Sequence, residues 1–447
     1  MTQTLRPSES PEALTTRLAN ARARTDEIFA RLTPDALYER PIAERHRLVF
    51  YLGHLEAFDQ NLVGQAYGLE SFHPAFDKLF AFGIDPTDGG LPNEAASEWP
   101  RREQILEYNA RVRSVVDECL AGARAIRPEF DGATIVNMAI EHRLMHAETL
   151  AYLLHQLPYP MKRGGQDHPA YGEPRAPRAG EASPAIRIPA GRATLGRDRG
   201  AGGFGWDNEF GVRVEQVPEF SIDEQKVTNG RFLEFVEAGG YDQPRSWSDE
   251  NWNWKEKRGI RHPSFWVRRP GPGPMSWGFR GMFAEEPLPL DAPVLVSHAE
   301  ASAFANWAGR SLPTEAQFHR AAYGTPSGDE RAYPWGDAPP RDEHGNFDLR
   351  RWGPTPVGSF PAGDSAFGVG ELVGNGWEWT SSIFEPFPGF EPHPLYAGYS
   401  ADFFDGKHFV MKGGSHRTAA SMLRRSFRNW FQPHYPYAYA AFRTVGS

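Results

Sequence analysis

Two histidines four residues apart, His142 and His146, lie in the segment EHRLMHAETLAYLLHQLP (141–158), which otherwise has the pattern of an apolar-faced helix. On a helix, side chains at i and i+4 point the same way and lie about 6 Å apart, so both imidazoles can face one point. His54 lies beside another apolar stripe and can supply a third imidazole from across a helical core. Burying three imidazoles without a shared partner costs about 1–3 kcal/mol each, and a metal ion removes that cost. The sequence therefore predicts a metal site formed by His54, His142 and His146.

The ligand types leave the metal open, because three imidazoles suit zinc as well as iron, copper or nickel. Other nearby candidates have the wrong spacing: His155 and Glu148 face away from the pair, and His46 lies more than two helical turns before His54. The alternative interpretation is structural, since a single histidine on an apolar helix face is more often a core residue than a ligand. The pair on one helix is what favours the metal.

Four helices are predicted to position these side chains. The second carries His54 beside a stripe formed by Leu48, Tyr51, Leu55, Phe58 and Leu62. Ser10 and Pro11 suit the start of the first helix, and Asp131 suits the cap of the fourth. A long loop, 71–100, separates the second helix from the third. The pattern predicts a four-helix bundle with helices at 11–31, 42–66, 102–123 and 131–156.

The rest of the chain has a different composition. Residues 158–185 are dense in Pro, Gly and charge, which predicts an interdomain linker. Beyond them come short apolar segments separated by Gly and Pro turns, with helices expected at 228–239 and 297–309, where Ser297 and Glu300 match a capping box. We therefore expect an α+β multidomain protein with a helical domain at 1–157, a linker at 158–185 and a loop-rich second domain at 186–447.

Composition narrows the class of protein. The net charge of −9 is spread along the chain without a basic cluster, which argues against a nucleic-acid partner. The single cysteine, Cys119, excludes an internal disulfide framework and suits a reducing compartment. The N-terminus lacks the apolar core of a secretory signal, and no apolar run approaches the roughly 20 residues that cross a bilayer. A cytoplasmic protein with no nucleic-acid or membrane partner is expected.

The second domain contains several distinctive phrases in order, including VTNGRFLEFVEAGGY, ANWAGRSLPTEAQFHRAA, YPWGD, GVGELVGNGWEWTSS, VMKGGSH and AFRTV. These resemble the formylglycine-generating-enzyme (sulfatase-modifying factor) fold, a C-type-lectin-like α+β domain, which implies that a structural Ca2+ could be present. Members that make formylglycine use a pair of cysteines late in this domain. Because Cys119 is the only cysteine and lies in the helical half, that activity is excluded.

The helical half, with His54 and the H-x-x-x-H of His142 and His146, looks like a DinB-type bundle. The two halves in this order resemble the ergothioneine-type sulfoxide synthases and the related selenoneine synthase. The resemblance implies that the three histidines hold a non-haem Fe(II). It further implies that hercynine (Nα-trimethylhistidine) and O2 react there with a sulfur or selenium donor. Three protein ligands leave open positions on an octahedral iron, which suits that chemistry.

A quaternary ammonium substrate is bound well by aromatic faces. The resemblance places Asn429 and Trp430 at the substrate pocket, whereas Trp377 and Trp379, inside the motif that defines the fold, are expected to be packing residues. Phe384 and Phe387 align with tyrosines of some relatives, one of which supplies a proton or electron near the iron. Tyrosines that could replace this function are Tyr435, Tyr437 and Tyr439.

Other departures concern the donor. Met145 replaces a glutamine that contacts the substrate imidazole in relatives, and Phe431 and Tyr435 stand where relatives that use γ-glutamylcysteine have charged side chains. A neutral, hydroxyl-rich selenosugar fits this pattern better than a donor with two carboxylates. Selenoneine synthase is therefore the first prediction, ahead of a sulfoxide synthase that uses cysteine or γ-glutamylcysteine. The loop residues Asp85, Asp88 and Glu94 are candidate acceptors for sugar hydroxyls.

Two further classes stay open at this point. DinB-type bundles with three histidines also serve zinc-dependent thiol transferases, which metal analysis and O2 consumption would distinguish. A lectin-like domain can also belong to a non-catalytic binding module, but that interpretation leaves the three histidines unexplained.

Overall fold

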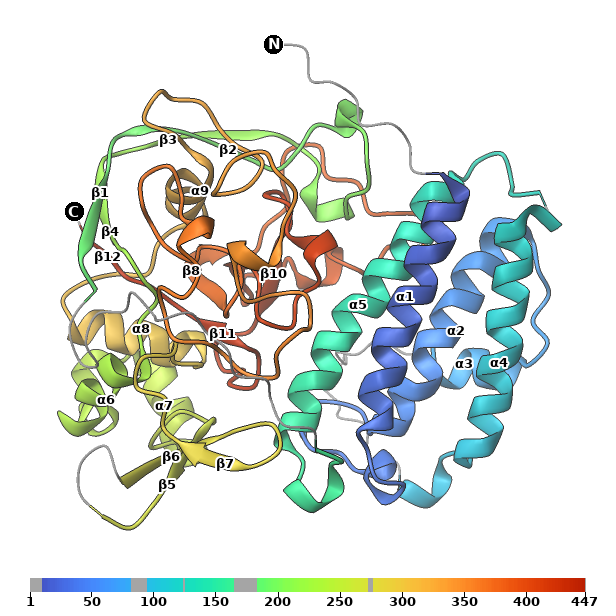
Figure 1. Cartoon of the computed structure of the whole chain (residues 1–447), viewed down its shortest axis with the longest axis horizontal. Helices are drawn as coiled ribbons and strands as arrows, with labels where there is room; N and C mark the ends of the chain where they lie inside the picture. Colours follow the sequence, from blue (N-terminus) through green and yellow to red (C-terminus); the bar gives the residue numbers. More distant parts are fainter. Residues whose placement is uncertain (1–9, 82–94, 124, 165–182, 272–275, 447) are drawn as a thin grey trace. The chain divides into compact units, whose positions relative to one another are not determined.

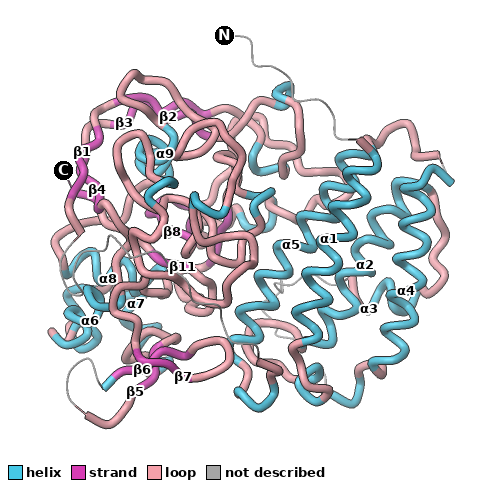
Figure 2. Tube along the Cα trace, in the orientation of Figure 1, coloured by secondary structure: helices cyan, strands magenta, loops and turns pink. Residues whose placement is uncertain are grey.

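The computed structural model describes residues 10–81, 95–123, 125–164, 183–271 and 276–446. The chain divides into two compact units. The first comprises residues Met1–Gly165 and Ala201–Phe204, and the second comprises Gln166–Gly200 and Gly205–Ser447. The first unit is helical, and the second combines short strands, helices and many loops (Figure 2).

The described residues of the first unit form four long helices, α1 (Pro11–Ala30), α2 (Leu48–Tyr67), α4 (Arg102–Glu118) and α5 (Gly132–Gln156). In this bundle α1 packs against α5, and α2 packs against both α4 and α5 (Figure 1). The ends follow the local chemistry: the side chains of Ser10 and Asp131 accept hydrogen bonds from the backbone of the first turns of α1 and α5. Gly68, at φ +66°, ends α2 in the left-handed region that favours glycine.

The bundle differs from the sequence prediction in two places. Helix α2 begins at Leu48 and not at residue 42. Residues 42–45 form a turn in which the Arg45 N–H donates to the Ile42 carbonyl, and the Leu48 N–H donates to the carbonyl of Glu39. The segment predicted as an irregular loop contains a short helix, α3 (Pro74–Leu79), whose first turn is capped by His73. After α4, residues Cys119–Ala123 continue as a wider π-helical turn.

The strands described in the second unit form four small sheets. The largest has the order β10-β9-β8-β11, with β8 (Trp377–Ile383) and β9 (Phe409–Lys412) at its centre and β10 (Asn429–Phe431) at one edge. Strand β11 (Ala440–Ala441) pairs with β8 in parallel, and the other pairs are antiparallel. The remaining sheets are β1-β4-β12 (Ala185–Ile188, Phe220–Asp223, Val445–Gly446), β2-β3 (Gly191–Leu195, Arg213–Val217) and β5-β6-β7 (Trp266–Arg268, Trp277–Arg280, Glu285–Pro287).

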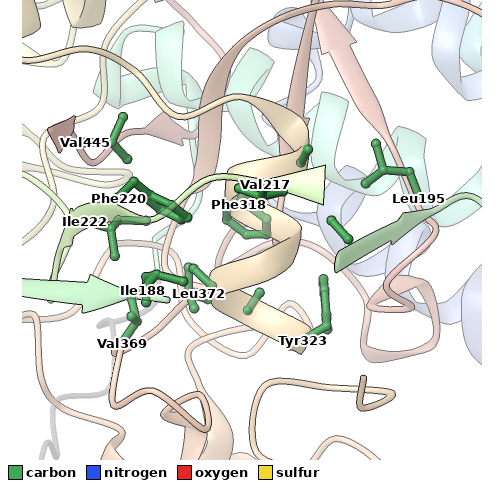
Figure 3. Close-up of a cluster of buried hydrophobic side chains, with 14 of the residues drawn as sticks. Ile188, Leu195, Val217, Phe220, Ile222, Phe318, Tyr323, Val369, Leu372 and Val445 are labelled. Atoms are coloured by element: carbon green, nitrogen blue, oxygen red, sulfur yellow. The ribbon is translucent and has the colours of Figure 1, made fainter. Parts of the chain in front are cut away.

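The described residues of this unit also form four α-helices, where the sequence predicted two. Helices α6 (Asn229–Glu237) and α8 (His298–Trp307) were expected, and the Ser297–Glu300 capping box is present. Helices α7 (Asp249–Arg258) and α9 (Glu315–Tyr323) were not predicted. Phe318 of α9 packs with β-strand residues such as Ile188, Phe220 and Ile222 in a buried apolar cluster (Figure 3). The unpredicted helix α9 therefore contributes to the core of this unit.

The predicted α+β organisation, a helical bundle followed by a mixed domain, agrees with the structure. In the described part of the chain, no helix is long and apolar enough to span a bilayer.

Candidate metal centre

The three predicted histidines come together in the interior of the bundle. His54 lies on α2 and both His142 and His146 lie on α5, and each side chain is at most 4 % exposed. The ring centroids are 5.2 Å apart for His54 and His142, 4.9 Å for His54 and His146, and 4.5 Å for His142 and His146. One ring nitrogen from each histidine lies within 4.8 Å of the other two. This spacing suits three ligands of a single ion.

Hydrogen bonding leaves ring nitrogens available for a metal. Nδ1 of His54 lies 2.6 Å from the carbonyl oxygen of Phe80, so this nitrogen carries the proton and donates it to the carbonyl. His54 Nε2 and His146 Nδ1 are buried and have no hydrogen-bond partner among the described residues. Buried polar atoms of this kind require a partner, and a cation that accepts imidazole lone pairs provides one. The residues therefore fit a bound metal ion.

The electrostatic environment keeps the imidazoles in the form that binds metal. Burial lowers the pKa of His54 to about 4, and the Phe80 carbonyl offsets this only in part. Burial also lowers the pKa of His142 and of His146 well below the usual value, and the neighbouring histidines add to the effect. Neutral imidazole is the metal-binding form. Among the described residues, no carboxylate groups with the three histidines as a further metal ligand.

Aromatic rings lie beside the three histidines, and the sequence analysis had placed two of them, Tyr51 and Phe58, on the apolar stripe of the second helix. Phe58 stacks on His142 with centroids 3.5 Å apart, and Phe50 stacks on His54 at 4.8 Å. Tyr51, one turn before His54, lies 5.8 Å from His146 between ring centroids. These rings limit how far each imidazole can rotate. The sequence signal for Tyr51 and Phe58 was their position on the stripe of α2, which does not distinguish packing from contact with ligands, and Phe50 had no such signal.

A buried ion-pair network adjoins the triad. Arg143, next to His142, is fully buried and donates to Glu56 at 2.8 Å and to Asp59 at 2.7 Å. Arg113 of α4 also donates to Glu56, at 2.7 Å. Burial alone raises the pKa of Glu56, but the two arginines more than reverse this and hold the carboxyl ionised. The network joins α2, α4 and α5 close to the three histidines. Met145, on the same helix as Arg143, is half-buried.

In the second unit, three of the predicted substrate residues lie together, namely Phe384, Asn429 and Trp430. Trp430 on β10 stacks on Phe384 with centroids 4.1 Å apart and planes inclined by 9°. Asn429 Oδ1 accepts a hydrogen bond from the Trp430 N–H at 2.9 Å. Phe403 and Tyr399 also contact Trp430, at 5.6 and 5.4 Å between centroids. We call Phe384, Tyr399, Phe403 and Trp430 the aromatic cluster. The sequence did not indicate Tyr399 or Phe403.

Phe387 is linked to this cluster through Arg428, whose guanidinium also lies 4.8 Å from the Phe384 ring centroid. Its ring belongs to the apolar core of the second unit, and the guanidinium of Arg428 lies 4.2 Å from its centroid. Trp377 and Trp379 are also buried, at 3 % and 0 % exposure, in agreement with the packing interpretation of the sequence.

The three candidate tyrosines divide into two environments. Tyr435 stacks on Phe431 at 4.9 Å and meets Tyr437 edge-on at 5.4 Å. Tyr439 is fully buried, and its ring lies 4.4 Å from that of His416. Tyr435 and Tyr437 can therefore act together, whereas Tyr439 belongs to a different, interior environment.

The buried carboxylate of Glu378, in the GVGELVGNGWEW motif, is paired with two side-chain cations. Glu378 binds Arg443 at 2.6 Å and Lys226 at 3.0 Å, and Lys226 also donates to the carbonyl of Glu371. The expected structural Ca2+ stays a prediction. The loop residues Asp85, Asp88 and Glu94 lie outside the described residues.

Both halves of the chain match known protein families. Residues 17–150 match the DinB superfamily, and residues 172–447 match the sulfatase-modifying factor enzyme 1-like domain. This confirms the predicted fold class.

Several relatives share the whole arrangement. "Hercynine oxygenase" of Mycobacterium tuberculosis is 34% identical over 97% of this chain and 98% of its own length. A protein of the same name from Mycolicibacterium smegmatis is 39% identical over 68% of this chain and 70% of its own. "Ergothioneine biosynthesis protein 1" of Neurospora crassa is 30% identical over 93% of this chain and 55% of its own. With its bundle, its second domain and its histidine triad, the chain belongs to the hercynine oxygenase family of ergothioneine-type sulfoxide synthases and is an enzyme of that family.

Proposed function

We propose that this protein is a non-haem Fe(II) enzyme that uses O2 to join the imidazole ring of hercynine to a chalcogen donor. The observation that carries the proposal is the buried triad of His54, His142 and His146, whose ring nitrogens share one focus. The names of the relatives, hercynine oxygenase and ergothioneine biosynthesis protein, support hercynine as the substrate.

The side chains of the triad have a defined task in this reaction. When bound, a ferrous ion supplies the centre at which O2 is activated and the two substrates are held. The three neutral imidazoles hold that ion, and the Phe80 carbonyl fixes the proton of His54 on Nδ1 so that Nε2 stays available. Phe50 and Phe58 cover ring faces of the ligands and exclude water from them.

We assign hercynine recognition to the aromatic cluster, together with Asn429. A trimethylammonium group cannot donate hydrogen bonds, and it is bound by the negative faces of aromatic rings. Trp430 is half-buried and stacked, so its ring is held in place for such a contact. Met145 and Phe387 stay predicted substrate contacts, and Tyr435 and Tyr437 are the proposed proton or electron donors, with Tyr439 as an interior alternative.

For the donor, the relatives named for ergothioneine biosynthesis favour a thiol, cysteine or γ-glutamylcysteine, over the selenosugar that the sequence placed first. One structural observation keeps the selenosugar as a second candidate. Phe431 and Tyr435, at the positions where charged side chains would bind the carboxylates of γ-glutamylcysteine, form an uncharged stacked pair. Such a surface suits a neutral donor.

The proposal is tested by reconstituting the metal-free protein with Fe(II) anaerobically and adding O2 with hercynine. Parallel reactions contain cysteine, γ-glutamylcysteine or a selenosugar, and product masses are read. A mass for hercynine joined to sulfur or to selenium identifies the donor. The proposal is wrong if O2 is not consumed with any donor, and a zinc-dependent thiol transfer without O2 would place the protein with the other DinB-type enzymes.

A further inference from the structure

A glycine adjoins the metal ligand His54, and the structure explains why no larger residue fits there. A Cβ atom built on Gly53 would lie 2.5 Å from two carbons of the Phe80 ring and 2.6 Å from a third. Atoms do not approach so closely without displacement. The Phe80 ring is fully buried and packs against Phe76 and Trp99, so it has no room to retreat.

The same residue, Phe80, provides the backbone contact to the ligand. Its carbonyl oxygen lies 2.6 Å from Nδ1 of His54. Phe80 follows the last residue of α3, and its own N–H bonds the carbonyl of Phe76 within that helix. The position of this carbonyl therefore depends on how closely α3 and its final residue approach α2 at Gly53.

Helix α3 is itself held in place by side chains of α2 and α4. The Tyr108 hydroxyl of α4 donates to Asp77 at 2.6 Å, and the Ser71 hydroxyl donates to the other carboxylate oxygen. Asn61 of α2 donates to the Asp77 carbonyl at 3.4 Å. The carbonyl that meets His54 is thus presented by an anchored element and not by a free loop.

We propose that Gly53 is a positioning residue for the metal centre. By leaving space for the Phe80 ring, Gly53 lets the Phe80 carbonyl lock the ring orientation and the Nδ1–H tautomer of His54. This inference rests on the proposed function for its consequence, metal binding, but the hydrogen bond itself is formed by groups of this chain alone. Partners that orient metal-bound histidines in this way typically change metal affinity 10–100-fold when they are lost.

The test uses Gly53→Ala in the full-length chain, with Gly64→Ala as the matched control. Both glycines are on α2, but a Cβ at Gly64 meets its nearest atom at 3.8 Å, an ordinary contact. Binding of Co2+ is measured from its visible absorption spectrum. The ring tautomer of His54 is read in the metal-free protein from 15N-labelled histidine by NMR, with the signal assigned by loss in His54→Gln.

We expect Gly53→Ala to weaken Co2+ binding about 10- to 100-fold and to alter the His54 Nδ1–H signal. Gly64→Ala should leave both within about twofold of wild type. Adding Phe80→Leu to Gly53→Ala removes the ring atoms that clash and should restore most of the affinity, which a general loss of folding would not allow.

Equal Co2+ affinity in the two alanine variants, or no recovery in the double variant, overturns the inference. So does a wild-type His54 that is protonated on Nε2, even if the metal binds. A wild-type chain that shows the Nδ1–H tautomer but binds no Co2+ contradicts the proposed function, while the contact between Phe80 and His54 is upheld.

Discussion

Burial determines the charge state of the three histidines. An imidazole removed from water binds a proton weakly, and each member of the triad also faces another imidazole or a nearby arginine. The folded chain therefore presents three neutral nitrogen donors at pH values where free histidine is partly protonated. The same property makes the metal-free protein sensitive to acid.

We expect the metal-free protein to lose stability as the pH falls from about 6.5 toward 4. The unfolded chain protonates His54 near its ordinary pKa, whereas in the folded chain burial lowers that pKa to about 4, so the unfolded state binds more protons in this window. The stability that neutral His54 gives the folded chain is fully present above pH 6.5. About 3 kcal/mol of it is lost at low pH. Urea unfolding of wild type and His54→Gln from pH 7.5 to 4 measures the difference. Parallel curves for the two proteins would refute this origin.

The triad was predictable because its pattern is local. Two histidines at i and i+4 on an apolar helix converge regardless of tertiary detail, and His54 lies on the core edge of another predicted helix. The contact from Phe80 was not predictable, because it uses a backbone carbonyl that any residue could offer. For the same reason, the stacking of Phe58 on His142 follows only from the packing of α2 against α5.

The helices that carry the three histidines are joined by charge as well as by apolar packing. Arg143 on α5 reaches Glu56 and Asp59 on α2, with all three side chains at most 1 % exposed. Burial raises the pKa of Asp59 even with Arg143 beside it, whereas Glu56 has a second arginine and a lowered pKa. The pairing therefore depends on Arg143 being present between the two carboxylates.

Replacing Arg143 by leucine should destabilise the bundle by about 3–5 kcal/mol, because both carboxyl groups would lose a buried partner. As a control, Arg31→Ala removes an exposed pair with Glu27 and should cost less than about 1 kcal/mol. Both values are obtained from urea unfolding followed by far-UV circular dichroism at pH 7.5. A cost for Arg143→Leu as small as that of the control would show that the network does not support the bundle.

The long bundle helices followed from periodicity and capping residues, but three shorter helices did not. Helix α3 lies in a segment that was interpreted as a loop because of its length, and its six residues give too short a pattern to detect. Helix α7, DENWNWKEKR, is largely polar and buries a single residue, Lys255, so no apolar stripe marks it. Helix α9 has the sequence of a capping box, Thr314 with Gln317, which was a usable signal.

The two units of the molecule have different proposed functions. The first unit contains the histidine triad, and the second contains the aromatic cluster on and around β10. A variant of the aromatic cluster should therefore change hercynine binding and leave Fe2+ binding unchanged. Composition and motif order predicted this division, whereas the membership of Tyr399 and Phe403 in the cluster depends on loop conformations that the sequence does not specify.

Trp430→Ala should raise the KM for hercynine about 5- to 30-fold, because it removes roughly 1–2 kcal/mol of cation–π attraction. The affinity for Fe2+ should stay at the wild-type value. Trp254→Ala is the control, because Trp254 is also half-buried and stacked, on His434 at 4.6 Å between centroids. Initial rates at varied hercynine concentration give the KM. An unchanged KM in Trp430→Ala would show that Trp430 does not bind hercynine.

Anaerobic titration with Fe2+ decides whether the three histidines form a metal centre. The full-length chain is compared with a variant in which His54, His142 and His146 are all replaced by alanine, and bound iron is counted per chain. We predict one tightly bound Fe2+ in the wild type and none in the variant, with the second domain still folded. One Fe2+ bound equally well by both proteins would contradict the metal centre and the chemistry built on it.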